Sequence, residues 1–220
     1  MERAKGFWFS SEETIGGGVL ALLLVTVFWG GVSVMLYGER FLIGVYPFSD
    51  LGVPYTVSKL PSLWSCVAFD MCMLLNAAIS AVLCGALLSE RAGPGRIVGG
   101  TALGLAAAGF LLAISPHTTL PFLHALGSGL AVGGWWLFLT CWVGARRGSA
   151  KADAAVQAIL QGTVLTYAFA FALDLPGKQV LQAAAIGGLA LAASWCSLRC
   201  SLRARAVRQT QARAGGIRER

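Results

Sequence analysis

Six long apolar runs limit what this chain can fold into. Each run holds about 20 mostly apolar residues, the length at which an α-helix crosses the hydrocarbon core of a bilayer. Hydrophobic residues make up 56% of the 220 residues and charged residues only 12%, more apolar surface than a soluble domain of this size can bury. We therefore predict an all-α integral membrane protein, a six-helix bundle. The predicted helices cover residues 16–37, 62–88, 97–115, 120–144, 155–173 and 180–198.

The basic residues are distributed unevenly over the segments that flank these runs. All but Arg40, Lys59 and Lys178 of the 17 Lys and Arg residues fall in the N-terminal segment, the second and fourth connections, and the tail from Arg199 onward. Lys and Arg accumulate on the cytoplasmic side of membrane proteins, so we predict that both termini are cytoplasmic. The position of these residues on one side of the membrane accounts for the net charge of +7. The charge is therefore no indication of nucleic-acid binding, and no nucleic-acid partner is expected.

The chain is expected to form one domain with short flanking segments. Residues 1–15 form an interfacial segment, in which Ser10-Ser11-Glu12-Glu13 resembles a helix N-cap followed by acids in the first turn. Within it, Phe7-Trp8-Phe9 is a predicted aromatic anchor. Residues 16–198 hold the six helices. Residues 199–220 form a basic cytoplasmic tail, interpreted as a topology signal and a frayed helix end, with anionic lipid as its alternative partner.

Connections and small residues indicate how the helices pack. The longest connection, residues 39–61, contains three prolines and two glycines, and we predict an ordered outer loop or a short re-entrant segment rather than a helix. Glycines four residues apart are typical of close helix packing. We assign Gly100 with Gly104, and Gly129 with Gly133, to packing inside the bundle, with a homo-oligomer interface as the alternative.

Asp70 interrupts the second apolar run and is the strongest single indicator of a functional site. A carboxylate within the bilayer is costly unless it faces protein or water, so it is a functional candidate by default. At 1.5 Å per residue, Asp70 lies roughly 12 Å and His124 about 6 Å from the outer ends of their helices. His117, Asp50 and Asp174 fall in outer connections. Five ionisable groups are therefore predicted near one end of the bundle.

Three interpretations of these groups are open. In the first, Asp70 and His124 form a structural ion pair that fixes the second helix against the fourth. In the second, they perform acid–base chemistry or bind a metal, for which histidine and carboxylate are suitable groups. The chain has only two histidines and no metalloprotease-like spacing, so no metal or cofactor is predicted. In the third, the groups recognise a polar headgroup that enters from the outer leaflet.

Short motifs in the first four spans resemble two known families. Tyr46-Pro-Phe-Ser-Asp-Leu-Gly52 resembles the Ser-Asp-x-Gly signature of the six-helix Frag/DRAM/Sfk family, in which a helix-embedded Asn follows, as Asn76 does here. Thr118-Thr-Leu-Pro-Phe-Leu-His124 is similar to that family's Thr-Thr-Leu run ending in His. The same layout, with Leu123-His-Ala-Leu-Gly127, is similar to a prokaryotic six-helix family known as domain of unknown function nine-ninety-eight.

The resemblance implies a shared outer-face feature and, for the eukaryotic relatives, a lipid-associated role. It supports Ser49, Asp50, Asn76 and His124, and offers no counterpart for Asp70. We predict a multi-pass protein of the prokaryotic plasma membrane whose outer polar site interacts with lipid or a small ligand, or which is an accessory subunit of a membrane assembly. Membrane lipids, a second copy or a larger complex are the expected partners.

The predicted site residues divide by role. The expected ligand-binding residues are Ser49, Asp50, Asn76, His117 and Asp174. In the alternative function, a membrane enzyme acting on a lipid or isoprenoid, Asp70 and His124 are the catalytic residues. A transporter is disfavoured because the sequence lacks an internal repeat.

Overall fold

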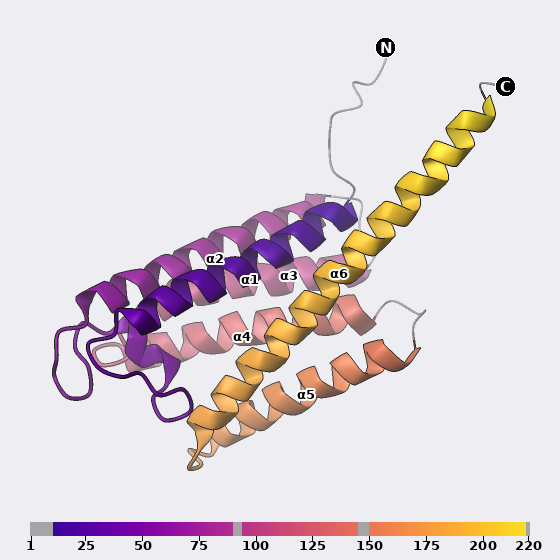
Figure 1. Cartoon of the computed structure of the whole chain (residues 1–220). Helices are drawn as coiled ribbons and strands as arrows, with labels where there is room; N and C mark the ends of the chain where they lie inside the picture. Colours follow the sequence, from indigo (N-terminus) through magenta and orange to yellow (C-terminus); the bar gives the residue numbers. More distant parts are fainter. Residues whose placement is uncertain (1–10, 90–93, 145–149, 219–220) are drawn as a thin grey trace.

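The computed structural model describes residues 11–89, 94–144 and 150–218, and most of them are helical (Figure 1). The long helices are α1 (Ser11–Met35), α2 (Leu63–Ser89), α3 (Pro94–Ala113), α4 (Pro121–Gly144), α5 (Ala150–Ala172) and α6 (Lys178–Arg218). All six are long and apolar enough to cross a membrane. This confirms the predicted all-α six-helix fold of a polytopic membrane protein. The predicted aromatic anchor, Phe7-Trp8-Phe9, lies outside the described residues.

The start of α1, the start of α5 and the end of α6 lie at least five residues beyond the predicted helix ends. α1 begins at Ser11 with Glu12 and Glu13 in its first turn, where acidic side chains oppose the positive end of the helix dipole. The two acids of the predicted pattern therefore lie in the first turn, although the apolar run itself begins later, and Ser10 lies outside the described residues. α6 is 41 residues long and continues to Arg218, so the tail is a continuation of the helix. The prediction was based on hydropathy, which identifies only the membrane-spanning part of α6. Beyond that part, the many alanine and arginine residues favour a helix.

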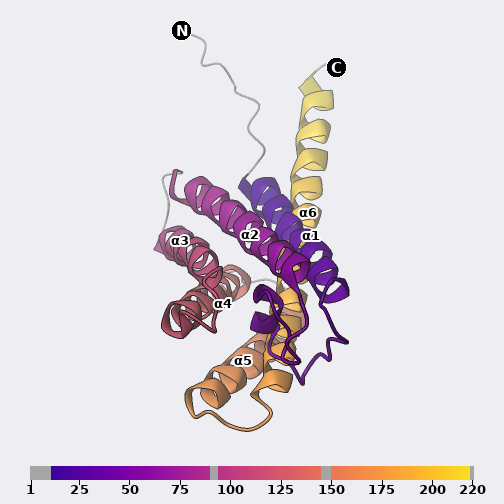
Figure 2. The same cartoon turned by 90° about the vertical axis from the view of Figure 1, so that its left-hand side faces the viewer.

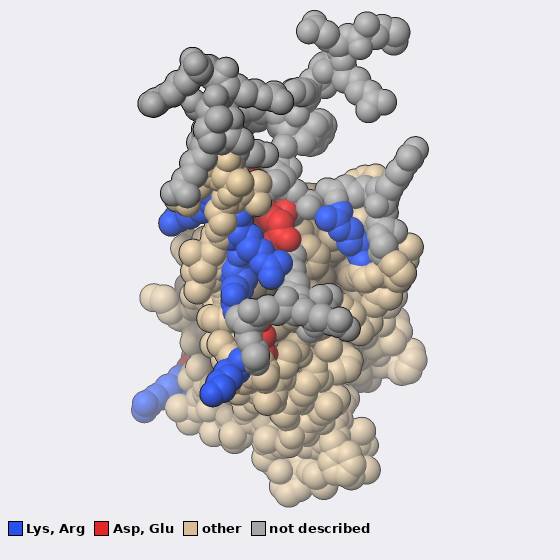
Figure 3. All heavy atoms as spheres, turned by 90° about the vertical axis from the view of Figure 1, so that its right-hand side faces the viewer, with Lys and Arg blue, Asp and Glu red and all other residues tan. Residues whose placement is uncertain are grey.

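The connections define two ends of the bundle, because successive helices run in opposite directions (Figures 1 and 2). We call one the capped end; it holds the loop of residues 36–62 and the turns of residues 114–120 and 173–177. The other, which we call the basic end, holds the start of α1 and the far part of α6. Figure 3 shows lysine and arginine side chains gathered at the basic end. The basic residues there whose side chains the structure describes are Arg96, Lys151, Arg199, Arg203, Arg205 and Arg208.

The predicted topology can be tested by labelling single cysteines introduced at Lys59 and Lys151, which are both exposed and lie at opposite ends. With the capped end outside, a membrane-impermeant maleimide is expected to label Lys59→Cys in intact cells and Lys151→Cys only after permeabilisation. The unsubstituted chain, whose cysteines lie in the spans, is the background control. Labelling of both variants from outside contradicts the topology.

α3 and α4 form the most extensive helix–helix contact, and glycines bring their backbones together. A Cβ added at Gly109 would lie 2.3 Å from the Ala131 backbone nitrogen, and one at Gly134 would lie 2.4 Å from the Ala102 carbonyl oxygen. Gly127 approaches the backbone nitrogen of Ala113 in the same way, at 2.5 Å. Close backbone approach through small residues is a principal means of packing helices in membranes.

The two predicted glycine pairs have different outcomes. Gly100 and Gly104 face α2, where added Cβ atoms would lie 2.7 Å from Leu88 and 3.3 Å from Cys84. Their assignment to packing inside the bundle is confirmed. For Gly129 and Gly133 the assignment is wrong, since an added Cβ would meet nothing within 4 Å. At about 100° per residue, Gly129 points away from the face that Gly127 presents to α3.

Candidate functional site

The loop of residues 36–62 folds back over the capped end and is fixed there by two serines. At its centre the short 3-10 helix η1 (Phe48–Gly52) buries Asp50 and Leu51. The Ser65 hydroxyl of α2 donates to the Leu51 carbonyl at 3.2 Å. The Ser33 hydroxyl of α1 donates to the Ser65 carbonyl at 2.8 Å. The buried serines therefore tie η1 to both α1 and α2.

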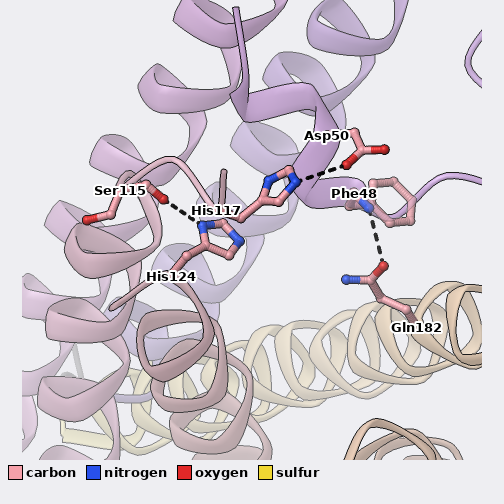
Figure 4. A network of polar contacts seen from close by, with 6 residues as sticks. All are labelled: Phe48, Asp50, Ser115, His117, His124 and Gln182. Atoms are coloured by element: carbon pink, nitrogen blue, oxygen red, sulfur yellow. Dashed lines mark hydrogen bonds and ion pairs between the residues drawn. The ribbon is translucent and has the colours of Figure 1, made fainter. Parts of the chain in front are cut away.

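Two further contacts fix the orientation of η1. A Cβ added at Gly52 would lie 2.7 Å from the ring of Phe69, so the glycine of the Ser-Asp-Leu-Gly run allows the loop to rest on α2. The Phe48 amide donates to Oε1 of Gln182 in α6 at 3.2 Å (Figure 4). η1 is thus held between α2 and α6, and its side chains have a defined place at the capped end.

Asp50, His117 and His124 come together beside η1 (Figure 4). Asp50 Oδ1 lies 3.5 Å from His117 Nε2, and their side chains are 10% and 32% exposed, respectively. The two imidazole rings meet edge to face with 5.8 Å between centroids. His124 Nδ1 lies 2.8 Å from the Ser115 carbonyl oxygen; because a carbonyl only accepts, Nδ1 carries the proton. The buried His124 is therefore oriented by the α3–α4 turn, while His117 extends the network to the surface.

An aromatic cluster lies on the same loop. We define it as Tyr37, Phe41, Tyr46 and Phe48. Ring centroids are 5.3 Å apart for Tyr37–Phe41, 5.8 Å for Phe41–Tyr46 and 5.9 Å for Phe41–Phe48. Tyr37 is buried, and the other three rings are half-buried. The cluster therefore forms a partly accessible aromatic surface.

Two carboxylates act on Tyr37 of this cluster. Burial raises the pKa of Tyr37, and the charges of Asp50 and then Glu39 raise it further. Burial also raises the pKa of Asp50, and the nearby His117 lowers it in part. Glu39 Oε1 is buried and has no hydrogen-bond partner among the described residues. An acceptor of this kind is costly to leave unsatisfied.

Asp70 lies in α2, roughly 10 Å along the helix from its start, and does not pair with His124. The Cys66 thiol lies 3.9 Å from Asp70 Oδ2 and 3.4 Å from the Gly52 carbonyl oxygen. Oδ1 is buried and has no hydrogen-bond partner in the part of the chain that the structure describes. The ion pair of our first interpretation is therefore absent there, and His124 Nδ1 instead donates to the Ser115 carbonyl.

The remaining predicted site residues lie apart from this network, except Ser49, which belongs to η1. Asn76 is buried deeper in α2, where its Nδ2 donates to the Thr26 hydroxyl of α1 at 3.0 Å. That bond joins two helices, as polar groups in membranes commonly do. Asp174 is exposed in the α5–α6 turn and pairs with Lys178, and the hydrogen bond from this lysine lowers the Asp174 pKa.

Sequence patterns did not single out Tyr37 and Glu39. The sequence signal for them is the run Tyr37-Gly-Glu-Arg-Phe41, where carboxylate and aromatic residues directly follow a span.

Within residues 11–89, 94–144 and 150–218, no three His, Cys, Asp or Glu side chains gather as metal ligands do. Comparisons of the chain with protein-family models, curated proteins and solved structures find no match.

Proposed function

We propose that this six-helix membrane protein binds a lipid headgroup or a small polar ligand at its capped end, through Asp50 and His117. One observation carries the proposal: a buried carboxylate is paired with a histidine that is itself 32% exposed. A ligand at the surface can therefore reach the pair without unfolding the loop. The serines beneath η1 hold the carboxylate in place before the ligand arrives, which limits the entropy lost on binding.

The apolar surface around the site favours a membrane lipid. The loop exposes large apolar side chains, among them Ile43, Tyr55 and Val57 at 64%, 63% and 67%. Surfaces of this kind mark contact with a membrane or another protein. A loop seated at headgroup depth would place Asp50 beside passing lipids, and the resemblance of the Ser49–Gly52 run to a lipid-associated family agrees with this role. We also propose that the capped end faces the outer side of a plasma membrane, as the basic residues at the other end favour.

The enzyme alternative receives less support from the geometry. It needs Asp70 and His124 at one reacting centre, and a general acid or base must lie within hydrogen-bond reach of the groups it serves. His124 instead donates to Ser115, and its ring lies beside His117. A binding role at the Asp50–His117 pair is compatible with the observed contacts and requires no rearrangement of His124.

Replacing Asp50 with asparagine is expected to weaken lipid binding about tenfold or more, since a hydrogen bond to a charged group contributes about 1.5–3 kcal/mol. The purified full chain in detergent would be titrated with short-chain phospholipids and the bound fraction measured by native mass spectrometry. His117→Gln should also weaken binding. Asp174→Asn, which removes an exposed carboxylate at the same end, is the matched control and should bind as the parent does.

The pH dependence of binding provides an independent readout. Burial raises the Asp50 pKa, so acidification neutralises this carboxylate at a higher pH than an exposed aspartate. Affinity should therefore fall as the pH drops, and Asp50→Asn should weaken this dependence. If Asp50→Asn and His117→Gln are folded, as judged by their melting temperatures, and both bind lipid as tightly as the parent, the proposed function is wrong.

A further inference from the structure

We infer that the group recognised at the capped end is an alkylammonium, the cationic part of an ethanolamine or choline headgroup. The inference rests on the proposed function and specifies its ligand. It is carried by the juxtaposition of the aromatic cluster with Asp50 and Glu39, on a loop whose exposed apolar side chains place it among lipids.

The charges at the site favour a cation over an anion. Asp50 lies in η1, two residues after Phe48, and Glu39 lies two residues before Phe41; the charge of each carboxylate raises the pKa of Tyr37. Among the described residues, His117 is the only basic side chain that pairs with Asp50, and Glu39 forms no ion pair. A phosphate placed between the two carboxylates would be repelled, whereas an ammonium would be attracted. A primary ammonium carries hydrogens that a carboxylate can accept, and Glu39 itself is half-buried.

The aromatic cluster supplies the second half of the recognition. The faces of aromatic rings attract ammonium groups, and aromatic side chains are the usual receptors for choline-type ligands. The cation–π contacts formed within the described chain lie elsewhere, from Lys178 to Phe171 and from Arg199 to Trp195. No described Lys or Arg therefore occupies the cluster. Its half-buried rings, Phe41, Tyr46 and Phe48, are available to a cation that enters beside Glu39.

A lipid is the source of the ammonium that this surface fits best. Ile43 and Val45, between Phe41 and Tyr46, are 64% and 58% exposed. Acyl chains can cover such side chains, whereas a free amine in water leaves them exposed. Arg40 follows Glu39 directly and is exposed, so it can meet the phosphate of a zwitterionic headgroup while Glu39 meets the ammonium.

The test compares three lipids with the same acyl chains on the purified full-length chain, again by native mass spectrometry. Phosphatidylethanolamine and phosphatidylcholine are expected to bind about tenfold more tightly than phosphatidylglycerol, which has the phosphate but lacks the cation. Phe41→Leu and Tyr46→Leu should each weaken binding of the first two lipids about fivefold, because they remove the ring and keep an apolar side chain. Phe122→Leu, which changes an exposed ring on α4, is the matched control and should have no effect.

Each result separates this inference from the proposed function. Equal binding of all three lipids that still depends on Asp50, or a preference for phosphatidylglycerol, overturns the alkylammonium inference and leaves the proposed function standing. If Phe41→Leu and Tyr46→Leu both bind the lipids as the parent does, the aromatic cluster does not bind the ammonium. If Glu39→Gln binds them as the parent does, the Glu39 carboxylate does not bind it. Displacement of the bound lipid by free choline or ethanolamine would support the ammonium and locate recognition in the headgroup alone.

Discussion

Replacing Gly109 with valine is expected to lower the melting temperature of the protein strongly, because it forces α3 away from α4. Even the Cβ of the new residue would lie 2.3 Å from the Ala131 nitrogen and 2.7 Å from the Gly127 carbonyl oxygen. These are backbone atoms, so no change of rotamer can make room for it. Overpacking of this kind costs about 3 kcal/mol or more when the backbone must move. Gly109→Ala should give a smaller loss in the same direction.

The chain provides a matched control for this prediction. An added Cβ at Gly129 or Gly133 of α4 would meet nothing within 4 Å, so Gly129→Val and Gly133→Val should melt close to the parent. Thermal unfolding of the purified variants in one detergent, followed by circular dichroism, makes the comparison. If Gly109→Val and Gly133→Val melt alike, the α3–α4 contact is not packed as the structure has it.

The fold was predictable because the bilayer restricts the chain so strongly. Lipid leaves backbone groups no partner outside a helix, so each apolar run of sufficient length had to form one. The rotation of each helix about its axis was not predictable in the same way. α4 carries Gly127, Gly129, Gly133 and Gly134, and the spacing rule selected the wrong pair. Which glycines face α3 depends on the fit of two whole helix surfaces, and no short pattern encodes that.

The sequence predicted at which end of the bundle the site residues lie, but it did not predict which neighbours their side chains contact. Counting residues from the helix ends brought Asp50, His117 and His124 to one end, and the structure places these three together. The same count put Asp70 at a similar level, yet its side chain lies beside Cys66. Asp50 comes near Tyr37 and Glu39 because η1, which carries it, is fastened to α2 and α6. The path of an irregular loop depends on such distant contacts, which do not appear in local sequence.

Replacing Asp70 with asparagine is expected to raise the melting temperature, by an amount corresponding to about 1–3 kcal/mol. The carboxylate lies within a candidate membrane span. Among the described residues, Oδ1 has no hydrogen-bond partner and Oδ2 has only the Cys66 thiol, at 3.9 Å. A charge in this position costs more than its contacts return, and asparagine keeps the shape while removing the charge. The measurement is thermal unfolding of the purified protein in detergent at pH 8.

Asp153→Asn is the control, because the same substitution is expected to change the melting temperature in the opposite direction. Its Oδ1 accepts hydrogen bonds from Trp195 at 2.7 Å and from Arg199 at 3.1 Å, so Asp153→Asn should lower the melting temperature by leaving a partly buried arginine without its counter-charge. A decrease for Asp70→Asn as well would mean that Asp70 has a stabilising partner, as our first interpretation held. An increase would mean that the chain keeps a carboxylate there at a cost in stability, which is the pattern expected of a residue retained for function.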